Sequence, residues 1–396
     1  MPGNSLLDFD AALARLLALA PPLSAEEIPI GSAGGRWLAA DVQARLTQPP
    51  AALSAMDGYA LRFSELPGPF HIAGEAAAGR PLARTLAPGE AARIFTGAHM
   101  PEGADTVALQ EDAVVGGGQV SFPVDGPSAR GAYVRPEGFD FREGAPLARA
   151  GERVTPARLG LLAAAGHASL PVHRLPRVAL LSTGDELVPP GIMPGRGQII
   201  GANGLMIADM LRSAGAEVID LGIVADRPEA LAAVIRQAKG ADLLVAIGGA
   251  SVGDHDLVKP ALEAAGASLD FWKVAIRPGK PLLAGRLGSA VVVGLPGNPV
   301  SAFVCARLFL VPLVRRLAGD PKPEDRPGEA VTAVPLEANG PRRHFARARL
   351  ENGRVTAFPE QDSSLLSVLA EANALVIRPE NGAALAAGTV VPVISL

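Results

Sequence analysis

Three glycine-rich segments between residues 242 and 301 carry side chains that suit a phosphate-bearing ligand and a hard metal ion. The first, GGASVGDHD, spans residues 248–256. Glycines let backbone N–H groups approach an anion, and Mg²⁺ prefers one or two carboxylates together with substrate phosphates. A simpler alternative is that the aspartates only cap the following helix. The segment predicts a phosphate-binding turn with magnesium ligands, formed by Gly248, Gly249, Ser251, Gly253, Asp254 and Asp256.

The other two segments supply positive charge and the start of a helix. RPGKP (277–281) contributes two cations, and GLPGNPVS (294–301) precedes an expected helix whose first turn favours anions. Exposed cations are often simply solvated, and the asparagine could serve as a cap alone. Loops that follow strands form ligand sites in open α/β sheets, so we expect one shared pocket. The candidate ligand-binding residues of these segments are Arg277, Lys280, Gly297, Asn298 and Ser301.

The sequence GASVG (249–253) also matches the G-x-S-x-G elbow of α/β-hydrolases. A hydrolase triad needs an acid and then a histidine after the serine in chain order. Only His255 and His344 follow Ser251, and His255 is too close in sequence to face it. We therefore favour the phosphate-binding interpretation over a Ser-His-Asp hydrolase.

Two further polar motifs are open to a structural or a functional interpretation. TGDEL (183–187) follows an expected strand, and its Glu186 could cap a helix, bind a metal or orient a partner. SAMDGYA (54–60) contains Asp57 in a turn that could be purely structural. The six histidines are scattered, and no HExxH or CxxC is present.

Composition limits the class of protein. A chain of 396 residues is too long for one hydrophobic core, so two to four domains are expected. The single cysteine, Cys305, excludes an internal disulfide framework and a zinc–cysteine cluster. The net charge of −4 argues against broad nucleic-acid binding. No apolar run reaches membrane-spanning length, and the N-terminus lacks a basic region before an apolar core, so we expect a cytoplasmic protein.

Apolar spacing and turn residues divide the chain into helical and strand-rich regions. Thr155 and Pro156 start one expected helix, and Asp226 with Glu229 forms an expected capping box for another. Alternation of strands and helices after residue 177 predicts a mainly parallel sheet. The expected helices are 5–20, 32–39, 155–166, 204–214, 227–239 and 299–317, and the expected strands of the sheet include 178–183, 217–222 and 242–247. A β-rich region at 49–139, a linker at 320–329 and a small C-terminal barrel or sandwich complete the prediction.

Taken in series, SAMDGYA, FTGA, STGDEL, GGxSVGDxD, RPGKP and GLPGNPVS resemble the molybdenum insertases of molybdenum-cofactor synthesis, the molybdopterin molybdenumtransferases related to the E domain of gephyrin. The resemblance covers nearly the whole chain. It implies a multidomain α/β plus β fold, with a molybdopterin-binding α/β/α domain and a homodimer. The implied domains are a discontinuous linking domain (1–45 and 140–176), an inserted β-rich domain (46–139), the α/β domain (177–320) and a C-terminal β-barrel (321–396).

The resemblance also implies a reaction: Mg²⁺-dependent transfer of molybdenum from molybdate to adenylylated molybdopterin, with release of AMP. The implied catalytic residues are Asp256, Lys280, Ser251, Asp57 and Glu186. Thr96 joins the ligand-binding residues named above, and Asp140 matches another polar position of the family's cleft. Asp254 and Asp256 would bind magnesium, and Arg342 and Ser363 would bind molybdate, with Arg343 and Ser364 as the alternative one residue away. Transient protein partners would be the molybdopterin adenylyltransferase and molybdoenzyme-maturation factors.

Two other functions compete with this interpretation. A nucleotide-type hydrolase of the CinA kind uses the same α/β domain, but the additional β-rich and barrel regions argue against it. A non-catalytic scaffold, like the gephyrin E domain in receptor clustering, is disfavoured because no fused domain or long linker is evident. Ala250 and Arg277 stand where many family members have Val and Lys; Arg277 changes the geometry of anion contact because a guanidinium is planar and bidentate.

Overall fold

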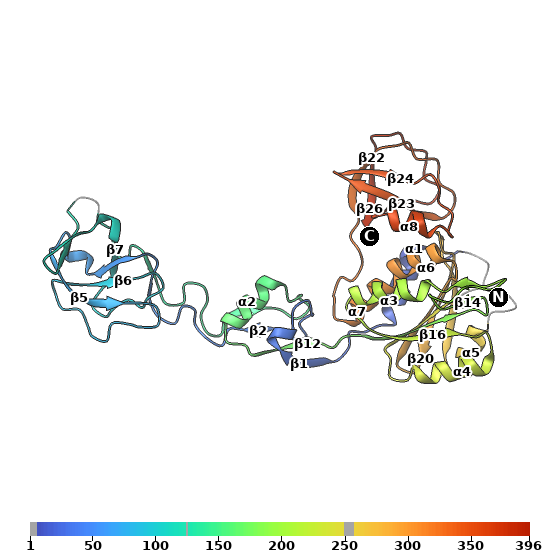
Figure 1. The fold of residues 1–396 in the computed structure, drawn as a ribbon, viewed down its shortest axis with the longest axis horizontal. Coiled ribbons are helices and arrows are strands. Elements are labelled where there is room, and N and C mark those ends of the chain that lie inside the picture. Colours follow the sequence, from blue (N-terminus) through green and yellow to red (C-terminus); the bar gives the residue numbers. More distant parts are fainter. Residues whose placement is uncertain (1–5, 124–125, 249–256) are drawn as a thin grey trace. The chain divides into compact units, whose positions relative to one another are not determined.

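The computed structural model describes residues 6–123, 126–248 and 257–396 (Figure 1). The chain forms two compact units. One contains the chain up to Glu26 together with His173–Leu396, and the other contains Glu27–Val172. The first unit therefore holds both the α/β region and the C-terminal strands.

A six-stranded sheet with the order β16-β13-β17-β21-β20-β18 forms the centre of the α/β region. β16, β13, β17 and β21 run parallel, whereas β20 is antiparallel to both of its neighbours. The strands are β13 (Arg177–Thr183), β16 (Glu217–Val224), β17 (Leu243–Ile247), β18 (Ser268–Lys273), β20 (Pro281–Leu287) and β21 (Ala290–Leu295). The prediction of a mainly parallel sheet is confirmed.

Helices cover both faces of this sheet, which makes three α/β/α layers (Figure 1). Because both faces are covered, strands such as β17 (LLVAI) are apolar at every position rather than alternating. One face packs against α1 (Phe9–Ala18), α3 (Asn203–Ser213), α6 (Pro299–Cys305) and α7 (Val311–Leu317). The other face packs against α4 (Pro228–Gln237) and α5 (Val258–Ala264).

The expected helix at 299–317 is helical throughout but contains a π segment, Ala306–Leu310, between α6 and α7. Pro312 explains this irregularity, because proline lacks an N–H and its ring clashes with the carbonyl four residues earlier, that of Leu308. Asn298 occupies the N-cap position as expected, yet its side chain makes no capping hydrogen bond. The Asn298 side chain is therefore free to face the cavity described below.

Two local predictions were wrong. Residues 32–39 form no α-helix: a 3-10 turn at Ile30–Ser32 is followed by isolated bridges to the 153–172 region, because Gly35 adopts a φ of +80° that an α-helix cannot contain. The capping box of α4 is absent, since Arg227 precedes the helix without a side-chain cap. The N–H of Asp226 instead donates to Asp185 Oδ1 at 3.0 Å, which draws Asp226 toward the end of β13.

The C-terminal strands form a closed barrel, because β23 pairs with both β24 and β25. Its apolar interior comes from alternate residues such as Ala346, Ala348, Val376 and Val393. β19 (Ile276–Arg277) pairs with β23 and so attaches the 277–281 segment directly to the barrel. The barrel strands are β22 (Gly328–Thr332), β23 (Arg343–Glu351), β24 (Arg354–Ala357), β25 (Ala374–Arg378) and β26 (Val390–Ser395), with α8 (Leu366–Glu371) beside them.

The second unit is built around another six-stranded sheet, with the order β7-β4-β6-β5-β9-β8. These strands are β4 (Gly58–Leu61), β5 (Phe70–Ala76), β6 (Glu90–Ile94), β7 (Thr106–Leu109), β8 (Val114–Gly116) and β9 (Gln119–Ser121). Short ladders then join the stretch before the sheet to the stretch after it: β1 (Ala25–Pro29) with β12 (Ser169–His173), β2 (Val42–Gln43) with β11 (Pro146–Ala148), and β3 (Leu53–Ser54) with β10 (Val134–Arg135). The β-rich region is therefore an insertion within a linking region made from two stretches of chain.

Helix α2 (Pro156–Ala164) lies in this linking region. Thr155 caps it by accepting a hydrogen bond from the N–H of Arg158, as the sequence predicted. Among the helices of the described residues, none has the length and apolarity that a membrane span requires.

Candidate functional site

The glycine-rich loops meet at one edge of the α/β sheet. β13, β17 and β21 end at this edge, and the antiparallel β20 begins there, which places residues 183–187, 277–281 and 294–298 together with Gly248. The N–H of Gly248 donates to the carbonyl of Leu295 at 3.1 Å. A Cβ on Gly248 would lie only 2.7 Å from the carbonyl oxygen of Thr183, so only glycine allows these loops to pack this closely.

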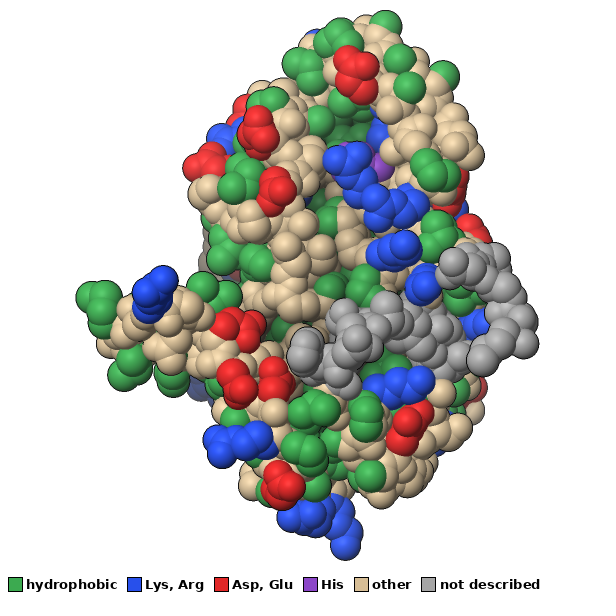
Figure 2. Space-filling view, turned by 90° about the vertical axis from the view of Figure 1, so that its right-hand side faces the viewer, with side chains coloured by type: hydrophobic (Ala, Val, Ile, Leu, Met, Phe, Trp, Pro, Cys, Tyr) green, Lys and Arg blue, Asp and Glu red, His purple; other side chains and the backbone are tan. Residues whose placement is uncertain are grey.

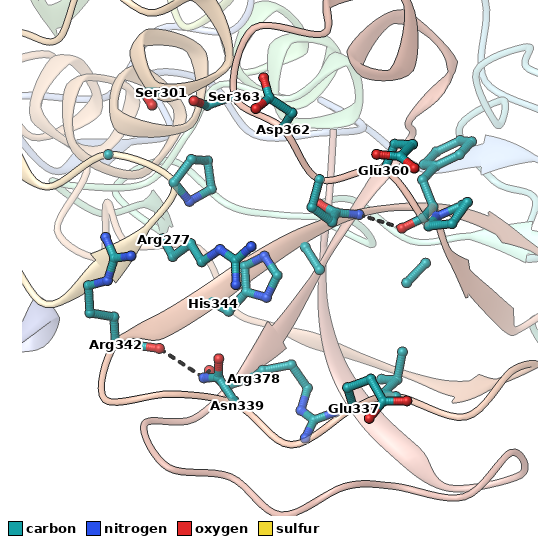
Figure 3. A pocket seen from close by; sticks show the side chains of 18 of the residues that line it. Arg277, Ser301, Glu337, Asn339, Arg342, His344, Glu360, Asp362, Ser363 and Arg378 are labelled. Atoms are coloured by element: carbon teal, nitrogen blue, oxygen red, sulfur yellow. Dashed lines mark hydrogen bonds between the residues drawn. The ribbon is translucent and has the colours of Figure 1, made fainter.

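A cavity of about 1250 Å³ lies between this sheet edge and the barrel. Lys and Arg side chains gather around the hollow on this face of the molecule (Figure 2). The cavity brings six of the expected site residues together: Arg277, Lys280, Asn298, Ser301, Arg342 and Ser363. Four Lys or Arg side chains line it, those of Arg277, Lys280, Arg342 and Arg378, so we refer to it as the basic cavity (Figure 3).

Arg277 and Lys280 are exposed to this cavity, and within the described part of the chain neither forms a hydrogen bond or an ion pair through its side chain. Their backbone is well anchored, since the N–H of Val274 donates to the carbonyl of Lys280 at 2.8 Å. Ser301, in contrast, is buried in the first turn of α6. The loop thus holds toward the cavity two cations that no carboxylate of the described residues neutralises.

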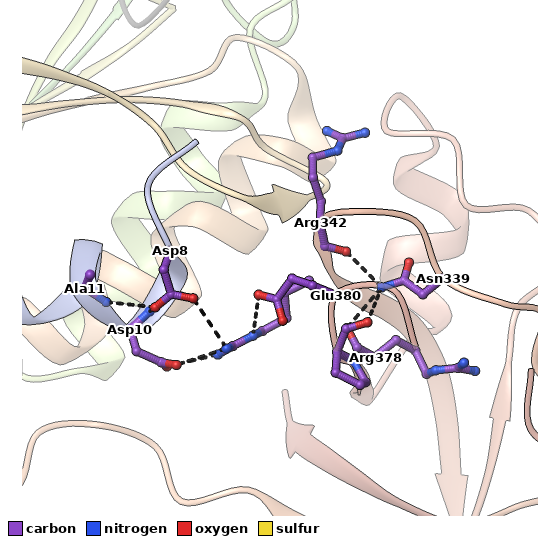
Figure 4. A network of polar contacts seen from close by, with 9 residues as sticks. Asp8, Asp10, Ala11, Asn339, Arg342, Arg378 and Glu380 are labelled. Atoms are coloured by element: carbon purple, nitrogen blue, oxygen red, sulfur yellow. Dashed lines mark hydrogen bonds and ion pairs between the residues drawn. The ribbon is translucent and has the colours of Figure 1, made fainter. Parts of the chain in front are cut away.

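The structure separates the two registers considered for the barrel residues. Arg342 lines the cavity, whereas the guanidinium of Arg343 binds both carboxylate oxygens of Asp10 at 2.9 Å (Figure 4). The same guanidinium lies 5.2 Å from the centre of the Phe9 ring. Arg342 directly precedes β23 and Arg343 is its first residue, and consecutive residues at a strand start point to opposite faces, which accounts for the difference. Likewise Ser363 lines the cavity, while the Ser364 hydroxyl donates to Asp362 Oδ1 at 2.6 Å. Arg342 and Ser363 are therefore the pair that an oxyanion in the cavity could reach.

A buried arginine shapes the segment that carries Ser363. Arg347 is 1% exposed and donates to the carbonyls of Leu365 (3.1 Å), Glu360 (3.3 Å) and Asp362 (2.9 Å). The N–H of Val300 in α6 donates to the carbonyl of Ser363 at 3.0 Å. The segment is thus fixed from the barrel side and from the α/β side. Its shape depends on contacts far apart in the sequence, which is why motif analysis did not identify Arg347.

The side-chain amide of Asn339 connects the two backbone segments that carry Arg342 and Arg378. Asn339 Nδ2 donates to the carbonyls of Arg342 (2.8 Å), Arg378 (3.2 Å) and Pro379 (2.7 Å) (Figure 4). A single side chain therefore fixes the backbone from which Arg342 and Arg378 project.

Asn339→Ala is expected to lower the stability of the barrel by about 1–3 kcal/mol, since the amide has two N–H groups to share among these carbonyls and each hydrogen bond contributes about 0.5–1.5 kcal/mol net. The thermal unfolding midpoint is the measurement. Glu337→Ala is the matched control, because Glu337 is exposed in the same loop and makes no hydrogen bond among the described residues. Equal midpoints for the two variants would show that Asn339 does not hold this part of the barrel.

His344 is a cavity residue to which the sequence assigned no role. Burial and, to a smaller extent, the positive charges of Arg277, Arg378, Arg342 and Arg347 together lower its pKa to about 4. The imidazole is therefore neutral at neutral pH. Because protonation is disfavoured only in the folded chain, His344 costs stability as the pH falls from about 6.5 toward 4.

An NMR titration of the intact protein is expected to give the His344 ring a midpoint near pH 4. Exposed His71 is a suitable internal reference, because it lies outside the basic cavity. A midpoint for His344 close to the ordinary value of about 6.5 would contradict the electrostatic description of the cavity.

The tip of β13 carries acidic residues beside Gly248 rather than in the basic cavity. Burial raises the pKa of Asp226, and the nearby carboxylates of Asp185 and Glu186 raise it further, while a hydrogen bond from Thr183 acts in the opposite direction. Glu186 thus lies at the same sheet edge as the cavity loops. Within the described ranges, no group of three or more His, Cys, Asp or Glu could hold a metal ion. The residues expected to bind magnesium and phosphate, Gly249, Ser251, Gly253, Asp254 and Asp256, lie outside the described residues.

Asp57 and Thr96 belong to the second unit and contact each other. Asp57 Oδ1 accepts hydrogen bonds from the Thr96 N–H and hydroxyl, both at 2.8 Å, and these bonds lower the pKa of Asp57. Asp140, in the same unit, donates its N–H to the carbonyl of Gln48 at 3.0 Å. The Asp57–Thr96 pair is therefore an ionised, oriented carboxylate at a turn of the β-rich region.

Three regions of the chain match known protein families. Residues 7–166 match the MoeA N-terminal region (domain I and II), residues 179–316 match the probable molybdopterin binding domain, and residues 329–396 match the MoeA C-terminal region (domain IV). The matches follow one another in the order that the sequence motifs predicted.

Curated relatives and solved structures agree over nearly the full length. The chain is 36% identical to molybdopterin molybdenumtransferase 2 of Mycobacterium tuberculosis, covering 98% of each chain. It is 34% identical to the molybdopterin molybdenumtransferase of Haemophilus influenzae, again covering 98% of each. A molybdopterin biosynthesis protein from Pyrococcus horikoshii matches in structure with a TM-score of 0.84 and 31% identity, covering 99% of both chains.

Proposed function

Because the chain belongs to the molybdopterin molybdenumtransferase family, we propose that it transfers molybdenum from molybdate to adenylylated molybdopterin, with release of AMP and a requirement for Mg²⁺. The observation that carries this proposal is the basic cavity, in which loops of the α/β sheet and residues of the barrel face a common space. An anionic nucleotide-bearing substrate and a tetrahedral oxyanion both suit such a cavity, since their charges need fixed cations.

In this proposal the 277–281 segment neutralises phosphate charge. Lys280 and Arg277 have no internal acidic partner among the described residues, so their charges are available to the substrate. Hydrolysis of the phosphoanhydride by water forms one P–O bond and breaks one P–O bond, which places additional negative charge on the departing AMP, and fixed cations stabilise that charge. Asn298 and Ser301 offer polar contacts beside these cations.

Arg342 and Ser363 would hold molybdate against the barrel wall. Two thiols of the pterin then replace one molybdate oxygen. That oxygen leaves as water together with the two thiol protons, and the molybdenum stays in the +6 state. The bonds formed are two Mo–S bonds and the bond broken is one Mo–O bond, so no oxidant or reductant is needed. Arg342 would neutralise the charge of the oxyanion during this exchange.

Asp254 and Asp256 would hold Mg²⁺, whose chemistry here is to neutralise the substrate phosphates. Their carboxylate oxygens are the donor type that Mg²⁺ prefers, and Asp185 and Glu186 add similar oxygens at the same sheet edge. We assign Asp57 and Thr96 to substrate contact within a cytoplasmic homodimer, with the molybdopterin adenylyltransferase and molybdoenzyme-maturation factors as transient partners. No nucleic-acid or membrane partner forms part of the proposal.

The test follows AMP release by the full-length protein from adenylylated molybdopterin with Mg²⁺, in the presence and absence of molybdate. The proposal expects release that molybdate stimulates, together with a molybdenum-containing pterin product. Full-rate release without molybdate would favour a nucleotide hydrolase instead. Absence of release under all conditions would contradict both enzymatic functions.

A further inference from the structure

Two arginines and a histidine form a row across three adjacent strands on the wall of the basic cavity. Arg277 of β19 pairs with His344 of β23, and His344 pairs with Arg378 of β25. Paired residues of neighbouring strands project to the same face of a sheet. All three line the cavity, and Figure 3 shows Arg277 beside His344.

Arg378 is the member of this row with no adequate partner. It is only 4% exposed, and within the described ranges its guanidinium donates to one group, the carbonyl of Ala383. Its Nε is buried without a hydrogen-bond partner, and no ion pair joins Arg378 to a carboxylate among the described residues. A buried charge without a partner is costly, so a site that keeps one is suited to a ligand of opposite charge.

Carboxylates near the cavity do not neutralise the row. Asp362 is held by Ser364, and Glu337 and Glu360 make no ion pair with Arg277 or Arg378 in the part of the chain that the structure describes. The imidazole between the two arginines is neutral, so it adds a hydrogen-bonding group without adding repulsion. Arg277 and Arg378 both act electrostatically on His344, so the row offers two positive charges and one neutral hydrogen-bonding group, which match the charge of a dianionic tetrahedral oxyanion.

We propose that Arg277, His344 and Arg378 form a subsite for a dianionic tetrahedral oxyanion, with Arg378 as its buried anchor. This subsite lies beside the Arg342–Ser363 pair, and the cavity is large enough for both. The identity of the oxyanion rests on the proposed function: it is either free molybdate or a phosphate group of the nucleotide-bearing substrate. Binding of the inorganic anion itself rests only on the geometry of the row.

Calorimetric titration of the full-length protein with sodium molybdate, and separately with inorganic phosphate, tests the subsite. Arg378→Met keeps the length of the side chain and removes the charge, and it is expected to weaken binding at least about tenfold. Arg378→Lys keeps the positive charge but loses the bidentate guanidinium, so its affinity should lie between those of the unmodified protein and Arg378→Met. Arg349→Met is the matched control, because Arg349 lies on β23 outside the cavity and pairs with Glu371. The affinity of this variant for the anion should equal that of the unmodified protein.

The same titrations distinguish the two sources of the oxyanion. Tighter binding of molybdate would identify a molybdate subsite, and tighter binding of phosphate would identify a subsite for a substrate phosphate.

An independent readout uses the unmutated protein, in case Arg378→Met does not fold. Added oxyanion should shift the His344 ring resonances, identified by their loss in His344→Gln, and leave those of His71 unchanged. The proposal is overturned if the unmodified protein binds neither anion, or if folded Arg378→Met binds as tightly as the Arg349→Met control. Failure of the AMP assay with intact oxyanion binding would instead overturn the proposed function and leave the subsite standing.

Discussion

Lys280→Met is expected to reduce molybdate-stimulated AMP release by about two to three orders of magnitude, the loss typical for removal of one fixed group that stabilises developing negative charge. The fold should persist, because the loop is anchored through the Lys280 carbonyl, which accepts from Val274 at 2.8 Å, rather than through the ammonium group. The measurement is the turnover rate under saturating substrate together with a thermal unfolding midpoint.

Lys239→Met provides the matched control. Lys239 is an exposed lysine two residues after the end of α4, near the start of β17, and therefore at the edge of the sheet opposite the basic cavity. Its replacement removes the same charge from the protein and should leave turnover unchanged. An equal loss in both variants would mean that overall charge, and not the position of Lys280, governs the rate.

Gly279→Ala is expected to have the largest effect on structure. Gly279 has a φ of +87°, and an added Cβ would lie 2.5 Å from the Sγ of buried Cys305. The backbone penalty and the steric overlap together should destabilise the unit by about 2–5 kcal/mol. The displaced loop would also carry Lys280 out of position, so activity should fall with the thermal midpoint.

Two further variants separate the backbone penalty from the overlap. Gly288→Ala introduces the same residue at a φ of +60° with open space around the new Cβ, so it should show the smaller, backbone part of the loss. Cys305→Ala removes the sulfur that the new Cβ would overlap. In a Cys305→Ala background, Gly279→Ala should therefore lower the thermal midpoint by less than it does in the unmodified protein. If Gly279→Ala lowered the thermal midpoint no more than Gly288→Ala, the conclusion that this loop packs closely on α6 would be contradicted.

The α/β sheet and its loops were predictable because each feature is encoded locally. Continuous apolar runs such as 243–247 indicate strands buried on both faces, and the glycines that follow mark their ends. The capping box at Asp226 failed for the opposite reason. Asp226 has the right local sequence, but its neighbours across the sheet edge, Thr183 and Asp185, compete for it through long-range contacts.

The barrel side of the cavity was only partly predictable. The family resemblance predicted Arg342 and Ser363, but which residues of each pair line the cavity became clear only from the chain direction at the start of β23 and from the contact of α1 with Arg343. Arg378 carries no motif: it reaches the cavity because β25 pairs with β23 some thirty residues earlier in the chain. Pairing of short, distant strands is not readable from local sequence, so this part of the site emerges only from the fold.

The most direct test of the account is anomalous diffraction at the molybdenum edge from crystals of the full-length protein grown with molybdate. We predict that the anomalous signal lies in the basic cavity, within contact distance of Arg342 and Ser363 or of the Arg277–His344–Arg378 row. The contradicting result would be molybdate bound reproducibly at another surface, with none in this cavity at saturating concentration. The oxyanion site would then not be formed by the sheet-edge loops and the barrel.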